Sequence, residues 1–468
     1  MFKRSIFIFH RSLRLDDNIG LIEALKNSTT VIPIFIFTSE QITKKNSFRS
    51  MFSIKFMVDS LIDLNDQLTK MGSKLYFYYG KQHDVLNTLL NDYDDIEAVY
   101  INKDFTQYAI DREDKLMKVA KKHDVEFFSC NDHTLHPINT IMTGSKTFYS
   151  VFTPFYNSGI KLSVDEPIKN KSKKYVSSKV RLGEISVNKI KKLLNNETDD
   201  NIDDYISDFF NGTRKDALVR LNNIKKQKDY AKTRNNLDMN TTQLSPYIKF
   251  GLLSIREVYH KIYDLFGKKH DLIKQLYWRE FYYNLSYNRL DVFDGNSFKE
   301  KYDKIKWIDN IKLFTKWKNG HTGFPIVDAG MRELNETGYM HNRARLITSN
   351  FLIKTLGIDW RKGEKYFASK LIDYDPSVNN GNWQWSSSSG ADSQPYFRIF
   401  NPWKQSIDHD PDCDYIKKWV PELNNVKNND IHNWYETHDD YDVDYPSPCI
   451  DYKESKDKIL KMYKVIYK

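Results

Sequence analysis

The sequence predicts two domains, an N-terminal α/β domain built on a doubly wound parallel sheet and an all-α C-terminal domain. Its 468 residues are more than one hydrophobic core usually organises. Through about the first 130 residues, short β-rich runs alternate with amphipathic segments, which is typical of a parallel sheet with right-handed crossovers. Beyond about residue 205 the strand signals disappear, and helical periodicity is interrupted by Gly, Pro and Asn-rich turns.

Five short apolar runs are expected to form the buried strands of the sheet. They are SIFIF (5–9), VIPIFIF (31–37), KLYFYY (74–79), EAVYI (97–101) and VEFFS (125–129). Between the second and third runs lies a helix-like stretch whose apolar residues recur near a 3.6-residue period, namely Phe52, Phe56, Leu61, Leu64 and Leu68. No G-x-G-x-x-G motif follows the first run, which disfavours a standard dinucleotide site there.

The chain turns polar between the two predicted domains. Residues 161–205 include KNKSKKYVSSK and NNETDDNIDD, which indicates an interdomain connection. We therefore expect an α/β domain over 1–135, a linker over 136–205 and a helical domain over 206–468. Segment 211–235 carries eight Lys or Arg against two Asp, and either a solvated helix face or a phosphate-facing role would explain it.

Composition limits the functional classes. The formal net charge of +9 suits a polyanionic partner, and 9 Trp, 30 Tyr and 28 Phe supply faces on which bases or flat cofactors can stack. Three scattered cysteines favour a reducing, intracellular compartment, cytoplasmic or nuclear/nucleoid, rather than secretion. No apolar run is long enough for a membrane span. DHDPDCD (408–414) lacks convincing metal-ligand spacing, so no metal site is expected.

Four stretches of the C-terminal half resemble the photolyase/cryptochrome flavoprotein family. They are TTQLSPYIKFGLLSIRE (241–257), LYWREFYYNL (276–285), GHTGFPIVDAGMRELNETGYMHNRARL (320–346) and LIDYDPSVNNGNWQWSSSSGADSQPYFRIFNP (371–402). The N-terminal FHRSLRLDDN and VFTPFYN (151–157) are similar to the same family, so the resemblance covers nearly the whole chain. It implies an antenna-type α/β domain followed by a helical, catalytic FAD-binding domain.

The resemblance also implies which residues hold FAD. Motif by motif, they are Tyr230, Thr241, Thr242, Gln243, Leu244, Ser245, Gln275, Arg279, Asn342, Arg345, Asp373, Tyr374, Asp375 and Asn379. The hydroxyls and helix-start amides of the run 241–245 suit phosphate oxygens. Arg345, paired with Asp373, would stabilise an anionic reduced flavin, and Asn379 would stand beside flavin N5.

Tryptophans are implied in two different tasks. Trp383, Trp360 and Trp307 match the three members of a relay that passes an electron hole outward from flavin. Trp278 and Trp385 match the pair that lines the cavity for a flipped-out pyrimidine dimer. The remaining residues implied to contact DNA are Arg234, Asn342, Arg343 and Arg398.

Two positions separate the lesion classes. Asn342 and Leu346 stand where enzymes for the (6-4) photoproduct resemble one another in carrying His, which disfavours that activity. The best match is to class I enzymes for cyclobutane pyrimidine dimers, although these usually carry Glu where Gln275 stands and Met where Leu346 stands. A carboxylic group can donate a proton to the dimer, whereas an amide can only hydrogen-bond.

The expected function is therefore light-driven repair of UV-damaged DNA by a monomeric FAD enzyme. The catalytic residues would be Trp383, Trp360, Trp307, Asn379 and Gln275. A blue-light photoreceptor without repair activity is the alternative, and a light-independent flavin oxidoreductase would leave the tryptophan relay without a task. The identity of a second, antenna chromophore stays open between a folate, a deazaflavin, a flavin and none, because Tyr108-Ala109 replace the Asn-Glu pair of folate-binding members.

Overall fold

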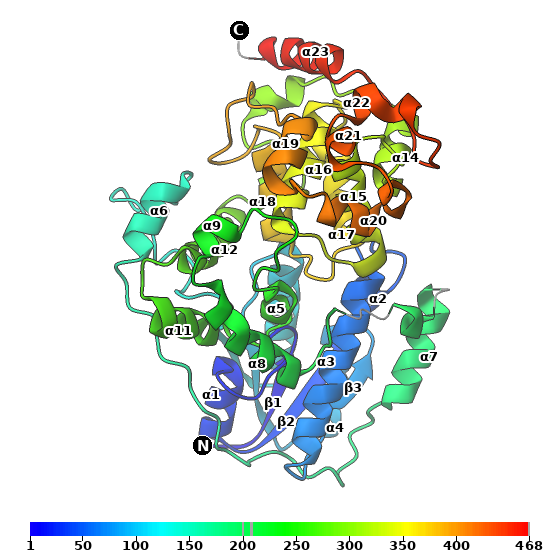
Figure 1. The fold of residues 1–468 in the computed structure, drawn as a ribbon. Coiled ribbons are helices and arrows are strands. Elements are labelled where there is room, and N and C mark those ends of the chain that lie inside the picture. Colours follow the sequence, from blue (N-terminus) through cyan, green and yellow to red (C-terminus); the bar gives the residue numbers. More distant parts are fainter. Residues whose placement is uncertain (199–200, 206–208, 467–468) are drawn as a thin grey trace. The chain divides into compact units, whose positions relative to one another are not determined.

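The N-terminal part of the chain forms the predicted five-stranded parallel sheet. In this computed structural model, which describes residues 1–198, 201–205 and 209–466, the strand order is β3-β2-β1-β4-β5 and all neighbours run parallel. Figure 1 labels β1, β2 and β3 of this sheet. The strands are β1 Phe2–Phe9, β2 Ser28–Phe37, β3 Tyr76–Tyr79, β4 Ile96–Asn102 and β5 Glu126–Cys130. Each overlaps one of the apolar runs expected from the sequence, so the predicted sheet is confirmed.

Helices cover both faces of this sheet. They are α1 Ile19–Asn27, α2 Ser39–Ile42, α3 Met51–Thr69, α4 Gln82–Asp92 and α5 Gln107–Lys122. Ile6 and Ile8 of β1 share a hydrophobic cluster with Leu86 of α4 and Leu116 of α5. Phe7 points to the other face, where a Cβ atom on Gly20 of α1 would come within 3.0 Å of its ring. Successive side chains of β1 thus pack against helices on opposite faces of the sheet, so the sheet is doubly wound.

Helix α3 follows the predicted apolar stripe. The Ser50 side chain caps its first turn by accepting a hydrogen bond from the Ser53 amide. The five residues expected to share one face are all buried, namely Phe52, Phe56, Leu61, Leu64 and Leu68. The 3.6-residue period therefore reports the buried face of this helix correctly.

Within the described residues after position 205 the regular elements are helical, as expected. They are α8 Arg214–Asn223, η2 Ile224–Gln227, α9 Tyr230–Thr233, α10 Ser245–Lys249, α11 Ile255–Phe266, α12 Asp271–Asn288, α13 Leu290–Phe293, η3 Glu300–Lys304, α14 Ile311–Asn319, α15 Pro325–Thr337, α16 Asn342–Lys354, α17 Trp360–Ala368, α18 Pro376–Ser386, α19 Pro402–His409, α20 Asp414–Trp419, η4 Pro421–Leu423, α21 Asn428–His432, α22 Trp434–Thr437, η5 His438–Asp440 and α23 Tyr452–Lys464. The polar region before them contains α6 Phe152–Gly159, α7 Val187–Thr198 and η1 Ile202–Asp204. Among the described residues, no helix is both long and apolar enough to cross a bilayer.

The chain divides into two compact units. The first contains residues 1–228 and 242–290, and the second contains residues 229–241 and 291–468. Helices α8, α10, α11 and α12 therefore pack in the same unit as the sheet. The domain boundaries expected at residues 135 and 205 stay a prediction.

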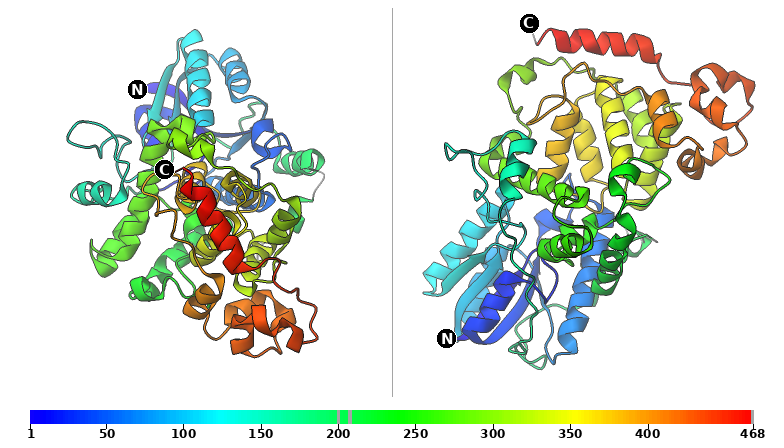
Figure 2. Two further views of the ribbon diagram at one scale, coloured as in Figure 1. Left: turned by 90° about the horizontal axis from the view of Figure 1, so that it is seen from above. Right: turned by 60° about the vertical axis from the view of Figure 1, so that its left-hand side comes forward.

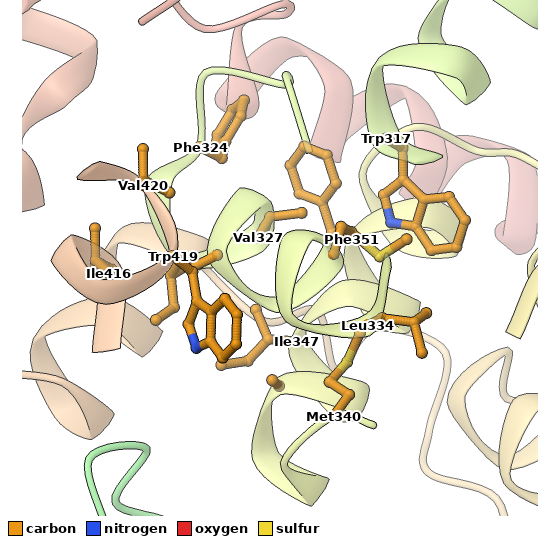
Figure 3. Close-up of a cluster of buried hydrophobic side chains, with 14 of the residues drawn as sticks. Trp317, Phe324, Val327, Leu334, Met340, Ile347, Phe351, Ile416, Trp419 and Val420 are labelled. Carbon is orange, nitrogen blue, oxygen red and sulfur yellow. The ribbon is translucent and has the colours of Figure 1, made fainter. Parts of the chain in front are cut away.

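The second unit is built around one large apolar cluster. Helices α15, α16 and α20 contribute Val327, Phe351 and Trp419 to it, and α14 contributes the fully buried Trp317 (Figure 3). Helix α23, red in both views of Figure 2, packs on this unit through a smaller cluster that contains Tyr463. This packing holds α16 and α18, which carry the predicted flavin-site residues Asn342, Arg345 and Asn379, and α17, which begins at Trp360 of the predicted relay.

Candidate functional site

The predicted site residues are distributed over both units, and the densest group lies in the second. There Arg345, on α16, donates from Nη2 to Oδ2 of Asp373 at 2.9 Å. Its Nε donates to the Met340 carbonyl at 2.8 Å, which fixes the plane of the guanidinium. Burial opposes the charge on Arg345, but the Asp373 carboxylate outweighs it and raises the pKa of the guanidinium. The predicted ion pair is present.

Asp375 and Asn379 stand at the start of α18. The Asp375 carboxylate caps the helix by accepting from the amides of Ser377 (3.1 Å) and Val378 (3.2 Å), with Pro376 in the first turn. Asn379 follows within that turn, and its backbone N–H donates to the Asp375 carbonyl at 2.8 Å. Capping therefore sets the direction in which the Asn379 side chain leaves the helix.

Glu364 of α17 is a site residue that the sequence interpretation missed. Asn379 Nδ2 donates to Glu364 Oε1 at 3.0 Å and to the Glu364 carbonyl at 3.3 Å. Because a carbonyl only accepts, this second bond fixes the orientation of the amide, and Oδ1 is left as the acceptor for another partner. Burial raises the pKa of Glu364 to about 7, although the bond from Asn379 opposes that shift. The sequence carried one indication that Glu364 belongs to the site: it follows Trp360 by four residues, so the two share a helix face.

The three tryptophans of the predicted relay all belong to the second unit. Trp383 and Trp360 are buried in its main apolar cluster, and the half-buried Trp307 packs against that cluster. Gly363 lets α17 approach Trp383, since a Cβ there would come within 2.3 Å of the indole. Trp307 meets Tyr463 of α23 edge to face, with ring centroids 6.1 Å apart. The set therefore runs from buried indoles to a partly exposed one, while its role in charge transfer stays a prediction.

A second group of positive residues lies in the same unit. Arg343 donates from Nη2 to Asn235 Oδ1 at 2.7 Å. Burial and the charge of the nearby Arg234 both lower the pKa of Arg343. His341 caps α16 through Nδ1, which accepts from the Arg343 amide, and burial and the charges of Arg345 and Arg343 lower its pKa to about 4. Arg398 is exposed on the segment after α18, and Trp385 is half-buried at the end of that helix.

Helix α12 of the first unit carries Gln275 and Trp278, which are expected near the lesion, and Arg279, which is expected to hold FAD. Gln275 and Arg279 are one turn apart, and Trp278 lies between them on the same side of the helix. The Trp278 indole stacks on the Phe152 ring with 3.7 Å between centroids and 5° between planes, so Phe152 covers one indole face. Arg279 donates to the His133 carbonyl at 2.7 Å. Phe152, to which the sequence interpretation assigned no role, therefore helps to orient Trp278.

The predicted phosphate run 241–245 is divided in sequence between the two units. In the second unit, the side chains of Thr241 and Tyr339 hydrogen-bond to each other, and Tyr230 begins α9. In the first unit, Gln243 has a positive φ of 50°, and Leu244 and Ser245 lead into α10. The basic segment 211–235 is partly neutralised, because Arg214 pairs with Glu257 and Arg220 with Asp216.

Comparisons with known proteins agree with this architecture. Residues 272–465 match the family model "FAD binding domain of DNA photolyase", and residues 5–170 match the model "DNA photolyase". The deoxyribodipyrimidine photo-lyase of Buchnera aphidicola subsp. Acyrthosiphon pisum is 37% identical, with 99% of this chain and 97% of the relative covered. That of Alkalihalophilus pseudofirmus is 33% identical, with 97% of both chains covered.

Solved structures are similar over the same extent. An archaeal photolyase from Sulfolobus tokodaii, described with two FAD molecules, has a TM-score of 0.87 and 38% identity over 99% of this chain and 100% of its own. A bacterial class III photolyase from Agrobacterium tumefaciens has a TM-score of 0.91 and 29% identity over 100% and 98%. A cryptochrome from Synechocystis has a TM-score of 0.87 and 28% identity over 99% of both chains.

Proposed function

Because the chain belongs to the DNA photolyase family, we infer that it is a light-driven DNA repair enzyme that catalyses the deoxyribodipyrimidine photo-lyase reaction with FAD as cofactor. Relatives of that name are 30–37% identical over nearly their whole length. The observation that carries the proposal is the grouping of Arg345–Asp373, Asn379–Glu364 and the buried Trp383 within one helical unit.

The residues of the second unit fit a flavin nucleotide. Nε2 of His341 and Nε of Arg343 are buried without a hydrogen-bond partner among the described residues. Because His341 Nδ1 accepts from a backbone amide, its Nε2 carries the proton, so both orphaned atoms are donors. The His341 donor and the nearby charge of Arg345 provide a setting in which a bound anionic group would gain a hydrogen bond and charge compensation.

When bound and reduced, FAD supplies on excitation by light the electron that opens the cyclobutane ring, and it recovers that electron afterwards. The side chains prepare for this in distinct ways. Asn379 presents Oδ1 as an acceptor because Glu364 holds its nitrogen, so it would bind the protonated N5 of a flavin. The Arg345 guanidinium compensates negative charge on the ring system.

Trp383, Trp360 and Trp307 would return the cofactor to its reduced state. Their positions in and against one apolar cluster support this proposal, because indoles in van der Waals surroundings can exchange electrons without a proton leaving at once.

Trp278 and Trp385 would receive the dimer. Since Phe152 already covers one face of Trp278, the base is expected against the rest of that indole.

We propose that a cyclobutane pyrimidine dimer in UV-damaged DNA is the lesion and that the enzyme acts as a monomer of the class I type. Arg234 and Arg343 support DNA binding, since two neighbouring positive charges favour a phosphate between them. Gln275 would contact the lesion by hydrogen bonding only. The exposed Arg398 adds a charge that salt would screen.

We propose a second chromophore in the first unit, beside the neighbouring strands β1 and β4, where the strand order changes direction: β2 and β3 lie on one side of this pair and β5 on the other. Ligands of doubly wound sheets bind at such a switch point. Nδ1 of His10 and Nε2 of His133 are buried there without a partner among the described residues, beside the Arg11–Asp104 ion pair. The two FAD molecules described in the archaeal relative favour a flavin. Extraction of the pigments and their absorption spectra would identify it.

The decisive assay measures repair of an oligonucleotide that contains one dimer. The protein, reconstituted with FAD and chemically reduced, is illuminated with blue light and compared with a dark control. Repair in light alone is expected. Tight binding of the lesion without turnover, while FAD is retained, would instead favour a photoreceptor, an alternative kept by the similarity to the cryptochrome from Synechocystis.

A further inference from the structure

Arg220 lies at the centre of a side-chain network that ends on Gln243. From α8, its Nη1 donates to Gln243 Oε1 at 2.8 Å. Its Nε donates to Asp216 Oδ2 at 3.1 Å and to the Tyr247 hydroxyl at 3.0 Å, and Nη2 donates to the Phe209 carbonyl. Each of its three nitrogens thus already donates to a protein acceptor, although the arginine belongs to a segment rich in exposed lysines.

The acceptor of that network, Gln243, has an unusual backbone. Its φ of 50° lies in the left-handed region, where the Cβ of an L-residue crowds the backbone. The next residue, Leu244, has right-handed values of φ −88° and ψ −10°. Such a reversal turns consecutive backbone N–H groups toward one side, which is a common way to bind an anion. The strained residue therefore shapes the part of the run 241–245 that is proposed to hold phosphate.

A left-handed backbone conformation at a residue other than glycine persists only where contacts with the surrounding structure hold that residue in place. The planar guanidinium of Arg220 does so by linking α8, through Asp216, with α10, through Tyr247. Tyr247 is fully buried and its hydroxyl donates to Asp216, and the Arg220 guanidinium also lies 4.9 Å from the Phe210 ring centroid. Arg220 is therefore held by Asp216, Tyr247 and Phe210 independently of its hydrogen bond to Gln243.

We propose that Arg220 is a positioning residue that holds Gln243 in the left-handed conformation and thereby keeps the loop 241–245 preformed for the diphosphate of FAD. The inference rests on the proposed function, because it requires that FAD is bound through this loop. Arg220 acts through Gln243, not by contact with the cofactor. A lysine could not replace it, since a single nitrogen cannot serve Asp216, Tyr247 and Gln243 in one plane.

The test is a double-mutant cycle on FAD affinity, measured by quenching of flavin fluorescence on titration of the apoprotein in the dark. Arg220→Gln should weaken FAD binding about tenfold, equivalent to about 1.4 kcal/mol. Glycine adopts a positive φ without the steric cost of a Cβ. In the Gln243→Gly background, Arg220→Gln should therefore change the affinity by less than about twofold.

Arg214→Gln is the matched control, because Arg214 lies on the same helix and pairs with Glu257 rather than with the loop. It should leave FAD affinity unchanged. An equal loss from Arg220→Gln in both backgrounds, or no loss in the parent background, would overturn the inference. If Arg220→Gln does not fold, Arg220→Lys completes the same cycle with the same expected coupling. A parent apoprotein that does not bind FAD would instead contradict the proposed function.

Discussion

Glu364 should make the stability of the second unit depend on pH in a defined direction. Its side chain is 4% exposed, and burial raises the pKa of the carboxyl from 4.5 to about 7. A raised pKa in the folded state means that the folded chain holds the proton more tightly than the unfolded chain. The stabilisation is therefore complete below pH 4.5 and is lost as the pH rises through 7.

The size of the effect follows from the two pKa values. Between pH 5 and pH 8 this carboxyl should remove about 2–3 kcal/mol from the free energy of unfolding. Glu364→Gln abolishes the titration and keeps an oxygen that accepts from Asn379 Nδ2, so the hydrogen bond can persist. The free energy of unfolding of the variant, minus that of the parent, should therefore rise by about 2–3 kcal/mol from pH 5 to pH 8.

Urea unfolding of the apoprotein, followed by tryptophan fluorescence, measures this difference, since several tryptophans lie in the same unit. Glu336→Gln, on the exposed end of α15, controls for the general loss of a negative charge. Parallel pH profiles for the parent and Glu364→Gln would refute the reasoning.

Three further predictions concern other parts of the chain. Lys354 is fully buried, donates to Ser388 and the Tyr396 carbonyl, and has its pKa lowered by burial from 10.5 to about 7. The parent should gain about 2 kcal/mol of unfolding free energy between pH 7 and pH 9, and Lys354→Met should abolish that gain in the same urea assay. Trp383→Phe should abolish light-driven reduction of bound flavin, seen in the absorption spectrum, yet spare repair by chemically reduced enzyme. Trp434→Phe, in the same cluster, should change neither, and normal photoreduction in Trp383→Phe would remove that residue from the relay. Gln275→Glu should maintain or raise the repair yield per absorbed photon, and a clear loss would contradict our interpretation of this position.

Local patterns in the sequence were enough for the elements of the fold. The strand at residues 31–37 was recognisable because a parallel strand buried on both faces reads as a continuous apolar run. The stripe from Phe52 to Leu68 was recognisable because 3.6-residue periodicity reports which side of a helix is buried. Motif resemblance then identified Arg345 with Asp373 as a pair, and their hydrogen bond is present.

The tertiary structure alone decided which side chains support the site from outside its motifs. The sequence interpretation did not single out Glu364, Phe152 or Arg220, and each acts on a residue at least 15 positions away in the chain. Secondary structure depends on neighbours a few residues apart, so a sequence records it directly. Which carboxyl is buried against an amide, and which arginine holds a strained loop, depends on how helices pack, because burial and hydrogen bonding are properties of contacts between distant segments.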